Sequence, residues 1–167
     1  MVWTRVPFPV IAALHGAVYG AGCQLALGAD IRIAGPDVKM AVMEMKWGIV
    51  PDMGGMVLLP KLVREDVMRR LTYTADPIDA DQALAWGMVT EKAEDPLAAA
   101  MALAEQITLK SPSAIRTAKR LITYANSGAA PKDVLMAESR EQAALIGKPH
   151  QMEVIAAQFG KRPPNFG

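Results

Sequence analysis

The stretch that decides the fold runs from Pro9 to Gly55: PVIAALHGAVYGAGCQLALGADIRIAGPDVKMAVMEMKWGIVPDMGG. Residues 9–14 are apolar throughout, which predicts a strand buried on both faces, as in a parallel or mixed α/β sheet. A glycine-rich turn over residues 15–22 leads into a short helix over 23–29. We further expect strands over 30–34 and 38–43, a loop carrying Glu44, and a segment 48–55 that ends in Gly54-Gly55.

The rest of the chain divides near residues 90–95. Up to that point the pattern mixes helix with one further edge strand, and beyond it Asp95-Pro96 and Ser111-Pro112 are helix starts and the pattern is helical only. We therefore predict an α/β part over 1–92 and an all-helical part over 93–167, with no internal repeat visible. The expected helices are 54–63, 64–73, 80–86, 97–109, 112–124, 132–146 and 150–159, and the edge strand is 88–90.

Composition excludes several classes of protein. The chain has 167 residues, half of them hydrophobic, and a net charge of +1, which favours one packed domain and gives no reason to expect nucleic acid or an acidic membrane surface as partner. Cys23 is the single cysteine, so no internal disulfide forms and a reducing cytoplasm fits. No metal-ligand spacing, secretory signal or bilayer-spanning apolar run is present in the sequence.

The glycine turn is the first candidate for chemistry. A strand that ends in such a turn and feeds a helix points backbone N–H groups at one place, which stabilises a phosphate or an oxygen that becomes anionic during a reaction. The turn lacks the Gly-Lys-Ser/Thr of a phosphate-binding loop. The dinucleotide fingerprint also fails, because Leu25 stands at its third glycine position, so a nicotinamide-binding domain is the weaker alternative.

Seven segments in this order carry a resemblance: 9–16, 20–26, 30–34, 48–55, 83–89, Ser111-Pro112 and 159–166. Together they resemble the crotonase superfamily, the enoyl-CoA hydratases and isomerases. The resemblance covers nearly the whole chain. It implies an α/β fold that is the C-terminal part of a crotonase-like spiral of ββα units, followed by a helical region that covers the core and serves oligomerisation.

The resemblance also implies a site. In the family, a backbone N–H of the glycine turn forms half of an oxyanion hole for the thioester carbonyl of an acyl-CoA, and the matching position is Ala21, between Gly20 and Gly22. Two acids act in family hydratases. Their positions here hold Gln24 and Glu44, which are 20 residues apart. Gln24 cannot take a proton, so the pair favours double-bond isomerisation, or slow hydration in which Gln24 only positions water.

Further expectations follow from the same resemblance. Trp47 and Met53 are candidates to contact an acyl chain. The substrate is an acyl-CoA, no separate cofactor or metal is implied, and the assembly is a homotrimer or hexamer. The family domain is longer at its N-terminus than this chain, so we expect an exposed edge at strand 9–14 and weak acyl-CoA binding. The alternative to an enzyme is a catalytically silent crotonase-like module whose helices mediate oligomerisation.

Overall fold

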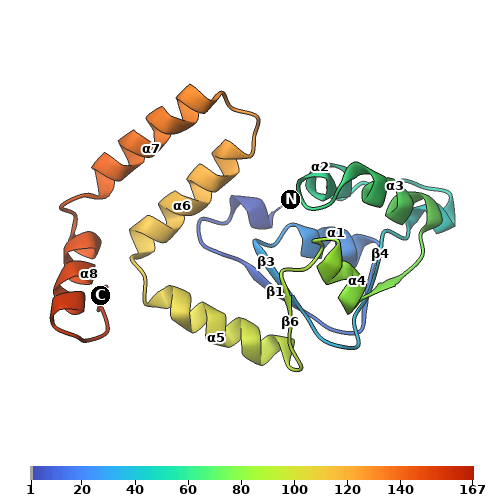
Figure 1. Ribbon diagram of the computed structural model, residues 1–167, viewed down its shortest axis with the longest axis horizontal. Helices are drawn as coiled ribbons and strands as arrows, with labels where there is room; N and C mark the ends of the chain where they lie inside the picture. The colour runs from blue at the N-terminus through green and yellow to red at the C-terminus, as the bar shows by residue number, and fades with distance from the viewer. Residues whose placement is uncertain (1) are drawn as a thin grey trace. The chain divides into compact units, whose positions relative to one another are not determined.

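In the structure, a computed structural model that describes residues 2–167, the strands form two small sheets (Figure 1). In the first sheet β1 (Ile11–Leu14) pairs in parallel with β3 (Ile31–Ala34), and β3 pairs in parallel with β6 (Glu91–Lys92). The prediction that β1 is buried on both faces is wrong except at Leu14, and its other residues are half-buried. Within the described residues β1 has a neighbouring strand on one side only.

The second sheet contains two strands that the sequence did not predict, of three and two residues. β2 (Ala17–Tyr19) lies inside the glycine turn and pairs in parallel with β4 (Lys39–Ala41), which pairs in antiparallel fashion with β5 (Ile78–Asp79). With three residues between Gly16 and Gly20, β2 is too short to show alternation in sequence. Its hydrogen bonds to β4 therefore decide its conformation.

The chain follows the same path twice. β1, β2 and α1 (Ala21–Leu27) form one round, and β3 and β4 begin the next, so that each round adds one strand to each sheet. The registers pair Ile11 with Ile31 and Val18 with Met40. This is the predicted spiral of ββα units. Helix α1 begins at Ala21, two residues earlier than the predicted start at residue 23.

Three further helices follow β4: α2 (Gly55–Leu58), α3 (Glu65–Thr74) and α4 (Ala80–Ala85). The predicted helix over 54–63 is wrong in length, because α2 gives way to the 3-10 helix η3 (Leu59–Lys61), which contains Pro60. Proline has no N–H for the helical ladder, which favours this change. The other short 3-10 helices are η1 (Trp3–Arg5) and η2 (Glu44–Trp47).

The edge strand predicted over 88–90 is also wrong. Met88 and Val89 are buried in the core, and the Met88 N–H donates to the carbonyl of Ala83 at the end of α4. The strand itself, β6, begins at Glu91, three residues after the predicted start. The core around these residues is apolar and draws on the sheets and helices of this part of the chain. Its largest fully buried apolar side chains are Leu27, Ile33, Met40, Leu59, Leu71 and Met88.

The chain separates into two compact units. One, here called the sheet unit, comprises residues 2–6 and 10–102; the other, the helical unit, comprises 7–9 and 103–167. The division falls within helix α5 (Pro96–Thr108). The predicted boundary between 92 and 93 stays a prediction. The change from an α/β part to an all-helical part is confirmed, since no strand follows β6 in the described chain.

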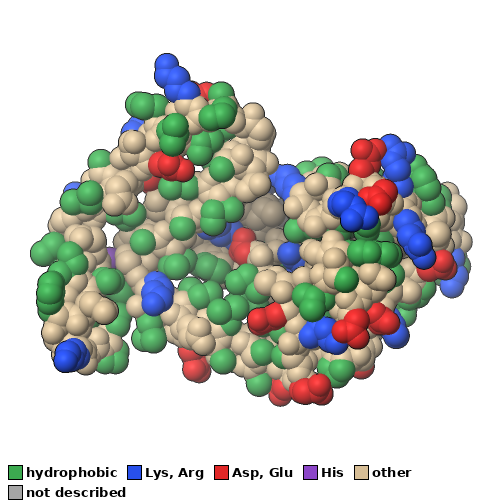
Figure 2. Space-filling view, in the orientation of Figure 1, with side chains coloured by type: hydrophobic (Ala, Val, Ile, Leu, Met, Phe, Trp, Pro, Cys, Tyr) green, Lys and Arg blue, Asp and Glu red, His purple; other side chains and the backbone are tan. Residues whose placement is uncertain are grey.

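The helical unit holds α6 (Pro112–Ala125), α7 (Pro131–Leu145) and α8 (Pro149–Phe159), with α7 antiparallel to α6 (Figure 1). Its buried apolar residues are two alanines, Ala137 and Ala157. Many larger apolar side chains are exposed, and Figure 2 shows such side chains over α7 and α8. None of the helices described for residues 2–167 has the length and apolar character to cross a membrane.

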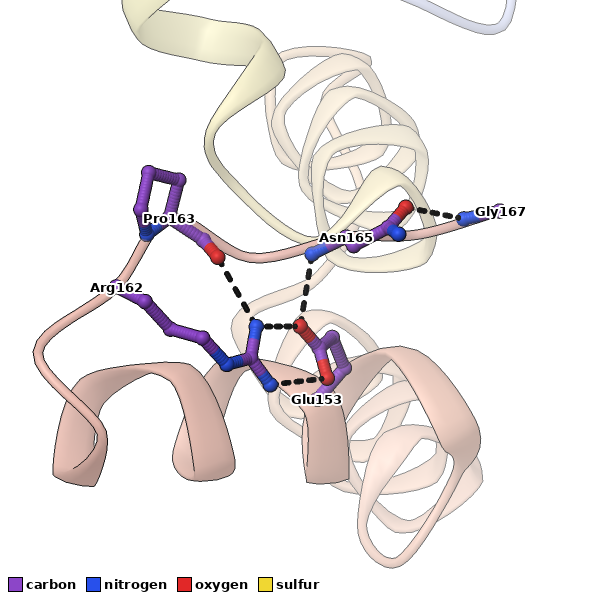
Figure 3. Close-up of polar contacts among 5 residues, drawn as sticks. All are labelled: Glu153, Arg162, Pro163, Asn165 and Gly167. Atoms are coloured by element: carbon purple, nitrogen blue, oxygen red, sulfur yellow. Dashed lines mark hydrogen bonds and ion pairs between the residues drawn. The ribbon is translucent and has the colours of Figure 1, made fainter.

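The C-terminal tail folds back on α8 (Figure 3). The Arg162 guanidinium donates to both carboxylate oxygens of Glu153, at 2.5 and 3.0 Å, and the Asn165 N–H donates to Glu153 Oε1 at 2.7 Å. These contacts, led by the Arg162 hydrogen bond, lower the pKa of Glu153 to about 2. Further along the tail, the Phe166 ring meets the His150 ring edge-on, with 5.4 Å between centroids.

Candidate active site

The glycine turn and the acid meet at one cavity of about 350 Å³. The cavity is formed where β2 ends, α1 begins and η2 crosses, so it joins two successive rounds of the spiral. It brings together four of the predicted site residues: Gly20, Ala21, Glu44 and Trp47. We call it the site cavity. Its lining residues are Tyr19, Gly20, Ala21, Met43, Glu44, Trp47, Ile49 and Asp52.

The backbone at Gly20 turns the chain sharply into α1. Gly20 has φ 50° and ψ −119°, a conformation that residues with a Cβ rarely adopt. Its N–H donates to the Ala41 carbonyl at 3.0 Å, and its carbonyl accepts from the Gln24 N–H at 3.0 Å. Ala21 is then the first residue of the helix, where an N–H has no acceptor within the helix itself. Ala21 lines the site cavity, and the donor capacity of its N–H is unused by the helix.

Glu44 is a buried acid, with 7% of its surface exposed. It is the first residue of η2, and Val42 and Met43 separate it from the end of β4. Its Oε1 accepts a hydrogen bond of 2.5 Å from Gln24 Nε2, whereas Oε2 is buried without a hydrogen-bond partner among residues 2–167. Buried polar atoms are rarely left unpaired, so Oε2 of this cavity-lining residue is an atom whose hydrogen bonding a ligand group would complete.

Gln24 lies beneath the site cavity rather than on its wall, and 1% of its surface is exposed. Its Oε1 accepts the N–H of Met53 and the N–H of Gly55, both at 2.9 Å. Because two donors occupy the amide oxygen, the amide nitrogen must be the atom that faces Glu44. Gln24 therefore connects the acid to the turn that opens α2.

The remaining predicted site residues lie around this arrangement. Gly22 is exposed on α1, with open space where a Cβ would point. Met53 does not line the site cavity, and its contribution is the N–H that it donates to Gln24. Trp47 lines the cavity but is 71% exposed, with Lys46 Nζ 5.8 Å from its ring centroid.

Among the apolar wall residues that the sequence analysis missed are Tyr19 and Ile49. Tyr19 directly precedes Gly20, and Ile49 donates its N–H to the Glu44 carbonyl at 3.3 Å. Adjacency to the predicted glycine and acid is the signal that would have found them. Their exposed apolar surface gives the cavity the mixed wall expected for a small-molecule site.

Cys23 sits next to this site without the properties of a nucleophile. It is fully buried, and burial, followed by the charge of Glu44, raises the pKa of its thiol to about 12. The thiol therefore stays protonated near neutral pH, and the thiolate is the reactive form. Across residues 2–167 no group of three or more His, Cys, Asp and Glu side chains is placed to hold a metal ion.

A larger cavity, of about 550 Å³, lies along α2, η3 and α3. Met56, Val63 and Met68 contribute its apolar wall, and Arg69 bonds Glu65 and Tyr73 at its rim. It contains none of the predicted site residues. Size alone is a poor guide here, because the smaller cavity is lined by the buried acid and by the first residue of α1.

Comparison with known proteins agrees with this architecture. The model of the enoyl-CoA hydratase/isomerase family matches residues 1–167, and the chain belongs to that family. A solved structure of an enoyl-CoA hydratase from Bacillus anthracis superposes with a TM-score of 0.93 at 30% identity, over 98% of this chain and 64% of that one. One from Polaromonas sp. JS666 gives 0.90 at 30%, over 98% and 64%. The predicted crotonase fold is confirmed.

Two curated relatives show how much of a longer chain is matched. A probable enoyl-CoA hydratase of Bacillus subtilis is 33% identical over 163 residues, which cover 96% of this chain and 63% of that protein. A crotonyl-CoA hydratase of Syntrophomonas wolfei is 37% identical over 163 residues, covering 95% and 61%. The chain thus spans about three fifths of the length of these relatives.

Proposed function

We propose that this chain acts on acyl-CoA thioesters, with Glu44 moving a proton at the carbon beside the thioester carbonyl. The observation that carries the proposal is that the buried Glu44 and Ala21, the first residue of α1, line one small cavity. Removing a proton from that carbon puts negative charge on the thioester oxygen. A hydrogen bond from Ala21 N–H would stabilise this enolate more than it stabilises the neutral thioester.

The reaction type that this site favours is double-bond isomerisation. A carboxylate takes a proton from C2 of a 3-enoyl thioester, the double bond moves to C2–C3 as the enolate collapses, and the same carboxyl returns the proton to C4. One acid is sufficient for this shuttle. Hydration instead needs a water deprotonated at C3 as well as a proton delivered to C2. Gln24, at the second acid position, cannot accept that proton.

The names of relatives support hydration as the second candidate reaction. Relatives are named crotonyl-CoA hydratase in Syntrophomonas wolfei and carnitinyl-CoA dehydratase in Citrobacter koseri. Both names describe addition or removal of water at a CoA thioester. A slow hydratase activity of this chain is therefore the runner-up, with Glu44 delivering the proton to C2. Neither reaction calls for a separate cofactor, since coenzyme A is part of the substrate.

We further propose that the helical unit covers the core and mediates assembly into a homotrimer or hexamer. The exposed apolar side chains of α7 and α8 support this role, among them Leu135, Ile155 and Phe159. The single, buried Cys23 supports a location in a reducing cytoplasm. A catalytically silent assembly module is the competing function, and the same exposed faces support it equally.

The decisive experiment compares the wild type with Glu44→Gln. Exchange of the C2 protons of a short 3-enoyl-CoA in deuterated water, followed by NMR, measures proton transfer directly, and crotonyl-CoA hydration is assayed in parallel. We expect Glu44→Gln to lower the exchange rate by about 10²- to 10⁴-fold, the usual contribution of a general acid or base. Wild-type protein that exchanges no faster than Glu44→Gln would leave the silent module as the function.

A further inference from the structure

Gln24 is the one buried polar side chain of the site that the proposed reaction leaves without a task. A glutamine amide offers one oxygen acceptor and two N–H donors. Here the oxygen is occupied by the N–H groups of Met53 and Gly55, and an amide hydrogen is directed at Glu44 Oε1, 2.5 Å from the nitrogen. The amide is held from both ends, so it has one orientation available.

This clamp distinguishes the two oxygens of Glu44. Oε1 is occupied by Gln24 and lies close to the Gly20 backbone, where an added Cβ would stand 3.5 Å away. Oε2 has no hydrogen-bond partner in the described chain. Since an N–H can only donate, the oxygen that faces Nε2 must act as acceptor, which keeps a proton off Oε1 while the contact lasts. A proton on Glu44 then resides on Oε2.

Resting on the proposed function, we infer that Gln24 is a positioning residue: it holds Oε1 of Glu44 and leaves Oε2 as the oxygen that exchanges the proton with substrate. In the forward step the C2–H bond breaks, its electron pair moves onto the thioester as the enolate, and the proton goes to Oε2. In the return step Oε2 gives that proton to C4. Oε1 stays an acceptor from Gln24 throughout.

The same clamp explains why a glutamine works where the family's hydratases have an acid. Two carboxylates at 2.5 Å repel and must share a proton, which makes their protonation depend on each other. An amide at this place supplies the hydrogen bond without a second titrating group. Its oxygen, occupied by two backbone donors, is also closed to water, so Gln24 directs the site toward a shuttle between carbons.

Two substitutions of Gln24 distinguish a role in positioning Glu44 from a role in the structure alone. Gln24→Met keeps the length of the side chain but removes the donor to Glu44, and we expect kcat for C2-proton exchange to fall about 10- to 100-fold with little change in KM. Gln106→Met, at an exposed position on α5, is the matched control and should leave the rate unchanged. Because Gln24→Met also strips an acceptor from Met53 and Gly55, a second variant is needed.

Gln24→Glu keeps that acceptor and makes the outcome pH-dependent. While the pair of carboxyls holds one shared proton, the new acid donates an O–H to Glu44 Oε1 as the amide did, and exchange should approach the wild-type rate. As rising pH removes the shared proton, repulsion breaks the contact and the rate should fall about 10-fold or more while the wild type stays active. If Gln24 acted only as the acceptor for Met53 and Gly55, Gln24→Glu would restore the rate without this pH dependence.

An NMR measurement on the same proteins tests the hydrogen bond between Gln24 and Glu44 without relying on turnover. In the wild type one Nε2 proton of Gln24 should resonate downfield and exchange slowly with solvent, and Glu44→Ala should abolish both features. If both features persist in Glu44→Ala, the inference is overturned. It is also overturned if Gln24→Met and Gln24→Glu leave the rate of C2-proton exchange unaltered at every pH. The proposed function would survive both results. Wild-type protein without C2-proton exchange would overturn the proposed function and the catalytic use of Gln24 together.

Discussion

Leu71 on α3 and Leu135 on α7 are both leucines on helices, yet 1% of the first is exposed and 61% of the second. The difference extends to the two units that contain them. The sheet unit buries its large apolar side chains around two sheets. The buried apolar residues of the helical unit are two alanines, and a helix cap and an ion pair between α6 and α7 add to its contacts. One unit holds a site in a packed core, and the other presents apolar faces that only another surface would cover.

The largest expected effect comes from replacing each of these leucines by alanine, which tests the difference in packing between the two units. Leu71→Ala should destabilise the sheet unit by about 2–5 kcal/mol, because it leaves a cavity in a packed core. Leu135→Ala should change stability by less than about 0.5 kcal/mol. Urea unfolding is followed by tryptophan fluorescence for the sheet unit, where Trp3, Trp47 and Trp86 all lie, and by far-UV circular dichroism for the helices of both units. An equal loss from Leu135→Ala would show that another surface covers this part of α7 in solution.

A buried cation gives the second contrast. The Arg32 guanidinium donates to the carbonyls of Met88 and Ala29, both at 2.6 Å, and burial lowers its pKa from the ordinary value. Arg32→Met should cost about 2–4 kcal/mol in the same urea assay, because it leaves buried carbonyls without donors. Arg116→Met, at an exposed position on α6, serves as control and should be near neutral. A stable Arg32→Met would mean that the carbonyls find other donors.

Helix caps test whether the two units unfold separately. Asp79 accepts the N–H of Gln82 at 2.9 Å in the sheet unit, and Ser111 accepts that of Ala114 at 3.3 Å in the helical unit. Replacing either by alanine should cost about 1 kcal/mol. We expect hydrogen exchange to accelerate in α4 for Asp79→Ala and in α6 for Ser111→Ala. Acceleration in both helices from either change would show that the units open together.

The smallest effect concerns pH and the tail. Since Arg162 lowers the pKa of Glu153 to about 2 from 4.5, docking of the tail is complete above pH 4.5 and is lost as pH falls through about 2. The Asn165 amide resonance, followed by NMR against pH, should shift over that interval. In Glu153→Gln the shift should disappear while tryptophan fluorescence of the sheet unit stays the same. Titration of the Asn165 signal near pH 4.5 would contradict the ion pair.

Much of the site was predictable because its chemistry is local. Glycines at 20 and 22 followed by a helix, and a lone acid flanked by apolar residues, indicated an N–H and a carboxyl before any coordinates. The role of Gln24 was not predictable in the same way. The N–H groups that fix its amide belong to Met53 and Gly55, about 30 residues away, and nothing in the letters shows that a turn will place them there. The prediction of short elements failed for a related reason, because β2 is a strand only through its pairing with β4.

The sequence alone determined that an α/β part is followed by helices, and which residue types stand at the site, since apolar runs, glycines and caps act over a few neighbours. Tertiary structure decided that Gln24 and Glu44, 20 residues apart in the sequence, are in contact. The second round of the spiral stacks β3 on β1 and β4 on β2, although no repeat is visible in the letters. Backbone pairing between the rounds, which is nearly independent of side-chain identity, therefore brings Gln24 to Glu44 and leaves Oε2 as the unengaged oxygen.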